Sequence, residues 1–116
     1  MIEMDGITIV TLTVAATGVL LAALGIPLYK QRVPPNMWYG CRTEKSLSEE
    51  RIWYSVNRVT GRDMIIAGVL VFVAALVIFP VRHTINDNLA IAILLGTLVL
   101  SVARMVVHSF RALRNA

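Results

Sequence analysis

The chain of 116 residues is too apolar for a water-soluble domain of its length, because 57% of its residues are hydrophobic and its mean hydropathy is +0.72. Its net charge of +4 would suggest nucleic acid as the partner of a soluble protein, but the positive charges here follow a membrane pattern, so we expect no nucleic-acid binding. The single cysteine, Cys41, excludes an intramolecular disulfide.

Three blocks without charged residues predict three membrane-spanning helices in one integral membrane domain over residues 1–116. A helix of about 20 residues crosses the roughly 30 Å of bilayer hydrocarbon, which places the spans at about 7–29, 63–80 and 88–110. The predicted fold class is therefore all-α, a three-transmembrane-helix bundle. The chain opens with acidic rather than basic residues, so we expect the first block to be a retained helix rather than a secretory signal.

Small residues gather in the first span, at Gly18, Ala22 and Gly25. Such residues let helix backbones approach closely, so we expect them to support packing within the bundle, with a dimerisation face as the alternative. Pro27 follows them, where it can bend or end the helix.

The loop over residues 30–62 collects most of the positive charge. Seven of the eleven Lys and Arg residues lie in it, three more follow residue 103, and one, Arg82, lies between the second and third spans. The positive-inside rule therefore predicts a cytoplasmic loop, an amino terminus outside and a carboxyl terminus inside.

The same loop should contain an ordered non-helical segment, residues 31–43, because Pro34 and Pro35 disfavour helix. Ser46 and Glu49 have the spacing of a capping box. Apolar residues then recur at helical spacing up to Val59, which predicts an amphipathic helix lying in the membrane interface.

The ends of the second and third spans also have signals. Gly61 is expected to separate the interfacial helix from the second span, and Pro80 to stop that span. Asn88 is the predicted cap of the third span.

Polar residues form a stripe along one face of the third span, at intervals of three or four: Thr97, Ser101, Arg104 and His108. We expect Arg104 to reach the interface and anchor the helix. The alternative is an ion pair with one of the acids Glu49, Glu50 and Asp63. His108 is interpreted as an interfacial histidine rather than a proton relay, since no second intramembrane ionisable group accompanies it.

No residue pattern indicates catalysis or a cofactor. The two histidines, His83 and His108, fall on opposite sides of the predicted membrane, so they cannot share a metal ion with Cys41. Cys41 also lacks a partner base for nucleophilic catalysis. The sequence therefore predicts a non-enzymatic protein without cofactor or metal.

One segment of the loop resembles the SdpI family of bacterial membrane proteins. The shared features are a proline-asparagine turn, a glycine followed one residue later by Arg-Thr, and Trp-x-x-x-Asn downstream. In this chain they are Pro35, Asn36, Gly40, Arg42, Thr43, Trp53 and Asn57, with Gly61 beyond. Cys41 stands where an aromatic residue is common in the family.

The resemblance implies a multi-pass protein of the bacterial cell membrane that protects against a membrane-active toxin peptide or binds a cytoplasmic regulator. Within the motif, Arg42 could tie the turn around Asn36 to backbone carbonyls or to Asn57 and so stiffen the loop. Alternatively, Arg42 contacts only anionic lipid headgroups. Three other functions are open: a structural or assembly subunit of a larger membrane complex, a homo-oligomer, and an oligomeric transporter.

Overall fold

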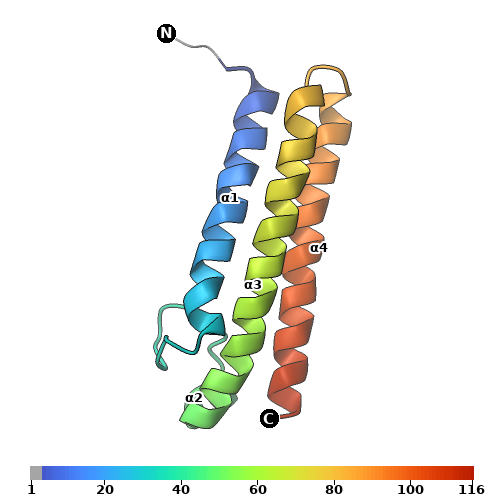
Figure 1. Cartoon of the computed structure of the whole chain (residues 1–116). Helices are drawn as coiled ribbons and strands as arrows, with labels where there is room; N and C mark the ends of the chain where they lie inside the picture. Colours follow the sequence, from blue (N-terminus) through green and yellow to red (C-terminus); the bar gives the residue numbers. More distant parts are fainter. Residues whose placement is uncertain (1–3) are drawn as a thin grey trace.

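The computed structural model describes residues 4–116 and shows three long helices side by side (Figure 1). Helix α1 spans Gly6–Tyr29, α3 spans Glu50–Ile78, and α4 spans Asp87–Arg114. A short helix, α2 (Glu44–Ser48), precedes α3, and a 3-10 turn, η1 (Phe79–Val81), follows it. Residues 4–116 contain no strand, so the predicted all-helical class is confirmed. Glu3, part of the acidic start, lies outside the described residues.

Helix α3 lies between α1 and α4, and the bundle is a nearly flat layer of 51 × 28 × 18 Å. All three long helices are long and apolar enough to cross a membrane. The chain is therefore a multi-pass membrane protein, as the charge-free blocks predicted. We call the end of the bundle that carries Tyr29, α2 and Arg114 the loop end (Figure 1).

Paired glycines bring α1 and α3 into close contact. A Cβ atom on Gly18 would lie 2.7 Å from the carbonyl oxygen of Gly68, and one on Gly25 would lie 2.6 Å from that of Gly61. Backbones this close allow only glycine at the crossing points. The small residues of α1 therefore serve packing inside the bundle, the first of the two interpretations offered above.

The separate interfacial helix is not present. Helix α3 runs without a break from Glu50 to Ile78, and Gly61 lies within it against α1. A mid-helix glycine costs about 1 kcal/mol relative to alanine, but here it allows the close approach to α1. The apolar face of the first turns is buried by protein, since Trp53 and Val56 have no exposed surface.

Two predicted caps shift by a few residues. Thr43, rather than Ser46, is the N-cap of α2, and Ser46 is the third helical residue of that capping box. Asn86, rather than Asn88, caps α4, because its side-chain oxygen accepts the backbone N–H of Asn88. Thr43 and Asn86 both have the extended backbone that an N-cap needs.

Both prolines lie within two residues of the helix ends that they predicted. Helix α1 continues through Pro27 and ends at Tyr29. Helix α3 ends at Ile78, and Pro80 lies in the 3-10 turn that follows. The positions at which the bilayer surfaces cross the helices, at about 7–29, 63–80 and 88–110, stay a prediction.

Candidate functional site

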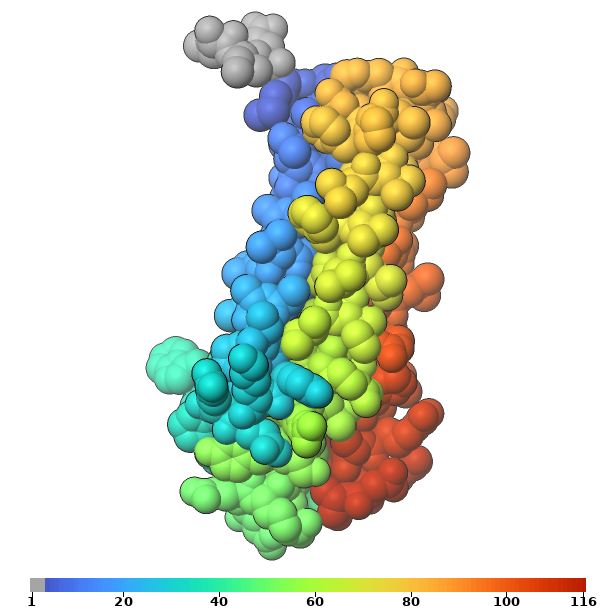
Figure 2. Space-filling view, viewed as in Figure 1, coloured from blue at the N-terminus to red at the C-terminus, as the bar shows by residue number. Residues whose placement is uncertain are grey.

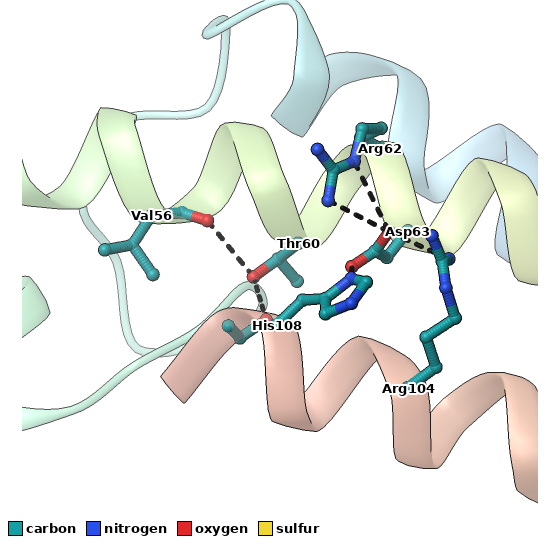
Figure 3. A network of polar contacts seen from close by, with 7 residues as sticks. Val56, Thr60, Arg62, Asp63, Arg104 and His108 are labelled. Carbon is teal, nitrogen blue, oxygen red and sulfur yellow. Dashed lines mark hydrogen bonds and ion pairs between the residues drawn. The ribbon is translucent and has the colours of Figure 1, made fainter. Parts of the chain in front are cut away.

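A buried carboxylate joins α3 to α4 near the loop end. The side chain of Asp63 on α3 has no exposed surface. Its Oδ1 accepts Nη1 of Arg104 at 3.1 Å, and its Oδ2 lies 2.7 Å from Nδ1 of His108 (Figure 3). Arg62, the preceding residue on α3, reaches the same Oδ1 with Nη2 at 3.3 Å. We call Asp63, Arg62, Arg104 and His108 the Asp63 cluster.

The helical spacing of α4 explains how two of its residues meet one acid. Arg104 and His108 are four residues apart and so lie on one face of the helix, one turn apart. Both side chains are partly exposed, at 43% and 26%, while the acid between them is fully buried. A buried carboxylate is tolerated when it is paired and hydrogen-bonded in this way.

A second polar contact lies one turn closer to the loop end. The hydroxyls of Thr60 and Ser109 share a hydrogen bond of 2.6 Å, and Thr60 also contacts the carbonyl oxygen of Val56 at 3.3 Å (Figure 3). Both hydroxyl residues are buried. The interface of α3 and α4 is therefore polar at this end and apolar at the other, where Val71, Ala75 and Leu94 pack.

The Asp63 cluster corrects two interpretations. Arg104 was expected to anchor the helix at the interface, but it pairs with Asp63, one of the acids considered. His108 was interpreted as having no ionisable companion, and Asp63 is that companion. Of the remaining stripe, Ser101 is buried, whereas Thr97 is half-buried and donates its hydroxyl to the carbonyl of Ile93 in its own helix.

The second candidate region is the folded loop before α3. Asn36 closes its turn, because its side-chain oxygen accepts the backbone N–H groups of Trp38 and Tyr39 at 2.7 and 2.9 Å, and its amide donates to the Pro34 carbonyl. Gly40 has a φ of 106°, a left-handed conformation that favours glycine. The turn is thus determined by local residues.

Helix α3 holds this turn with two side chains. Asn57 accepts the backbone N–H of Cys41 at 2.5 Å and donates to the carbonyls of Cys41 and Trp53. The indole Nε1 of Trp53 donates to the Val33 carbonyl at 2.8 Å. Segment 33–57, which we call the platform, includes the first turns of α3. It is therefore one ordered unit at the loop end of the bundle (Figure 2).

The remaining motif residues fall in or beside the platform. Arg42 donates from Nη1 to the Met37 carbonyl, within the turn, and does not contact Asn57. Thr43 caps α2. Pro35 precedes the turn residue Asn36, and Gly61 lies one turn beyond Asn57 against α1.

Cys41 is half-buried beside Asn57, and burial raises the pKa of its thiol. A protonated thiol is a weak nucleophile. Residues 4–116 contain no group of three His, Cys, Asp or Glu side chains that could hold a metal ion.

The sequence interpretation missed the role of Asp63, although a signal for it exists. Helices α3 and α4 are antiparallel neighbours joined by residues 82–86. In two antiparallel helices, residues at equal distances from the connecting turn lie opposite each other. Asp63 and Arg104 are 21 and 20 residues from Thr84, which lies in that turn. This register would have selected Asp63 from the three candidate acids.

Together, three helices able to span a membrane, a buried carboxylate paired across two of them and a folded platform define a small multi-pass membrane protein. Residues 32–108 match the SdpI/YfhL protein family, and the chain belongs to that family. The matched residues include the platform and the Asp63 cluster. Comparison with curated proteins and with solved structures gives no match.

Proposed function

We propose that this protein is a non-enzymatic immunity or signalling protein of a bacterial cell membrane, whose spans intercept a membrane-active peptide and whose platform binds a cytoplasmic partner. The observation that carries the proposal is the platform itself. Trp38 is 88% exposed and Met37 is 69% exposed, on a turn that Asn36 and Asn57 hold in place. A rigid turn that presents a tryptophan is typical of a binding surface, because aromatic anchors dominate interface energetics.

The proposed orientation places the loop end in the cytoplasm and the amino terminus outside. Its support is the distribution of charge, with ten of the eleven Lys and Arg residues in or beside the loop end and Arg82 alone at the other. Cysteine-accessibility labelling of intact cells tests it. A residue such as Asn86, changed to cysteine in a Cys41→Ser background, should react with a membrane-impermeant maleimide from outside, and Asn115→Cys should not.

The proposed contact for a peptide is an apolar groove between α1 and α3. It has a volume of about 340 Å³ and its lining includes Val19, Ile26, Val69 and Phe72. Val19 is 55% exposed, so Val19→Phe would fill the groove without disturbing the bundle. We expect this variant to lose protection against the peptide, whereas Leu20→Phe, at an exposed position outside the groove lining, should keep it.

The test of function is survival. Deletion of the gene should sensitise the host to its own secreted peptides or to those of neighbouring cells, and the intact gene should restore growth. Full resistance of the deleted strain to both would reject the immunity role. Crosslinking from a photoreactive residue at position 38 would then test the platform separately for a cytoplasmic partner.

A structural or assembly subunit remains the second candidate. The surfaces that suggested it are engaged within the chain, since Gly18 and Gly25 pack against α3 and Arg104 pairs with Asp63. Docking would therefore use other faces. Detergent pull-down with mass spectrometry distinguishes the two, because a stoichiometric large partner favours a subunit and recovery of this chain alone favours an autonomous module or homo-oligomer.

Transport is a third candidate, favoured by one observation. Asp63 and His108 form a pair of ionisable groups inside the bundle, where such groups commonly mark ion or proton paths. Proteoliposomes with an imposed pH gradient test this role. A proton flux that the wild-type protein supports and His108→Gln abolishes would favour transport over immunity.

A further inference from the structure

An open hollow lies between α3 and α4 beside the Asp63 cluster. It has a volume of about 290 Å³. Its polar lining comes from both helices, with Arg62 on α3, His108 and Arg111 on α4 and Asn115 as the C-cap of α4, and its other walls are aliphatic. Four groups that can donate hydrogen bonds thus surround one space, and the hollow has no acidic residue in its lining.

The charges around this hollow do not balance. The carboxylate of Asp63 is shared among Arg62, Arg104 and His108. The side chain of Arg111 makes no hydrogen bond or ion pair with any residue of 4–116, although it lines the same hollow. Arg111 is exposed, so its guanidinium is free to pair with an anion that enters the hollow.

Arg111 also borders a second hollow, which is largely apolar. This hollow has a volume of about 410 Å³, and Val106, Val107, Phe110 and Arg114 form the rest of its lining. Val107 and Phe110 are 52% and 59% exposed. Because Val106 lies farther from the loop end along α4 than Arg111 does, the apolar hollow extends from the polar one toward the middle of the bundle.

We propose that the polar hollow is a binding site for a phosphate group. Arg62 and Arg111 provide planar guanidinium groups that pair with phosphate oxygens through two hydrogen bonds each. The side-chain amide of Asn115 supplies a further donor. The adjoining apolar hollow fits an acyl chain, which favours an anionic phospholipid as the source of the phosphate over a soluble phosphate ester.

The test uses the full chain purified in detergent and native mass spectrometry. Phosphatidylglycerol is compared with a glucosyl-diacylglycerol of the same acyl chains, which has no phosphate. The central variant is Arg111→Gln, since Arg111 has no intramolecular partner whose loss would affect folding. Arg51→Gln is the matched control, because it removes the same charge at a side chain that is 72% exposed and outside both hollows.

We expect the wild-type protein to retain phosphatidylglycerol in preference to the glycolipid. Arg111→Gln should weaken that retention by about tenfold or more, because glutamine removes the charge and the paired hydrogen bonds of the guanidinium. Arg51→Gln should retain the lipid as the wild type does. If inorganic phosphate or glycerol 3-phosphate instead raises the unfolding temperature in an Arg111-dependent way while neither lipid is preferred, the phosphate site stands with a soluble source. Equal retention of both lipids without such a shift, or equal losses in the two variants, would overturn the proposal.

If Arg111→Gln fails to fold, Asn115→Ala provides the second variant, because Asn115 lines the same hollow at the end of α4. Its expected effect has the same direction and is smaller, since a neutral donor contributes less than a charged one. In that case, an unchanged affinity in the folded Asn115→Ala protein would overturn the proposal. The proposal is independent of the immunity role and can stand or fail without it.

Discussion

The carboxylate oxygen Oδ2 of Asp63 lies 2.7 Å from Nδ1 of His108, although the two residues are 45 positions apart in the chain. This contact, with the ion pair to Arg104, joins α3 and α4 at a level where the first span carries no charge. Together with the hydrogen bond between Thr60 and Ser109, it forms the polar part of the interface between the two helices.

Asp63→Asn should lower the free energy of unfolding by about 3 kcal/mol, the lower end of the range for breaking a buried ion pair, because Arg104 is partly exposed. The neutral amide cannot balance the guanidinium groups of Arg62 and Arg104, and only its oxygen accepts hydrogen bonds, so a partner at the position of Oδ2 is lost. Thermal unfolding in detergent measures the effect. Glu44→Gln, an exposed acid on α2, is the control, and equal midpoints for the two variants would contradict a structural role of the cluster.

Asn57→Ala should release the platform. It removes three hydrogen bonds to the backbone of Cys41 and Trp53 and leaves the N–H of Cys41 unsatisfied, at a cost of about 1 to 3 kcal/mol. Trypsin should then cleave faster after Arg42 and Lys45, while cleavage after Arg114 stays the same. Asn88→Ala is the control, as Asn88 is exposed and its side chain makes no such contacts. An unchanged cleavage rate in Asn57→Ala would show that the turn holds without α3.

Arg42→Lys tests whether Arg42 stiffens the turn. The guanidinium donates to the Met37 carbonyl across the turn, and the lysine ammonium lacks the planar fork that holds this geometry. We expect faster proteolysis of the loop and a lower unfolding temperature. If both properties stay unchanged, Arg42 acts only as a charge for lipid headgroups, because a lysine serves that purpose equally well.

Gly68→Ala should separate α1 from α3. A Cβ atom at this position would lie 2.6 Å from the backbone nitrogen of Ala22, a distance that side chains do not tolerate. We expect a marked fall in the unfolding temperature. Gly96→Ala on α4 is the control, since a Cβ there meets nothing within 4 Å and alanine favours helix by about 1 kcal/mol. Equal effects of the two substitutions would show that the close approach of α1 and α3 does not stabilise the bundle.

The thiol of Cys41 should resist alkylation up to high pH. Burial raises its pKa above the ordinary 9.0, so the folded state favours the neutral thiol. Its contribution to stability is present below the unfolded pKa and is lost as pH rises through the folded pKa. Iodoacetamide labelling between about pH 7 and pH 10 should show a rate increase at higher pH in the folded protein than in the denatured one. Coincident pH profiles would mean that the thiol is solvated, and Asn57→Ala should move the folded profile toward the denatured one.

The sequence alone determined that the protein has three membrane-spanning helices, that its positive charge collects at one end, and that residues 31–43 form an ordered turn. These properties depend on the local order of residues. Hydropathy blocks, Pro34 and Pro35, and the turn residues Asn36 and Gly40 act on their immediate neighbours, so they can be read along the chain. The family motif also predicted which residues of the loop belong together.

Only the tertiary structure decided which acid pairs with Arg104, that His108 has an ionisable companion, and that α3 continues through Gly61. Each depends on how two helices pack against each other. Gly61 interrupts a helix when considered alone, but against the backbone of α1 it is the residue that allows the helices to touch. Likewise, Asp63 is one acid among several until the α3–α4 turn brings it level with Arg104, because a buried charge is stabilised by the partner it meets in space and not by its neighbours in sequence.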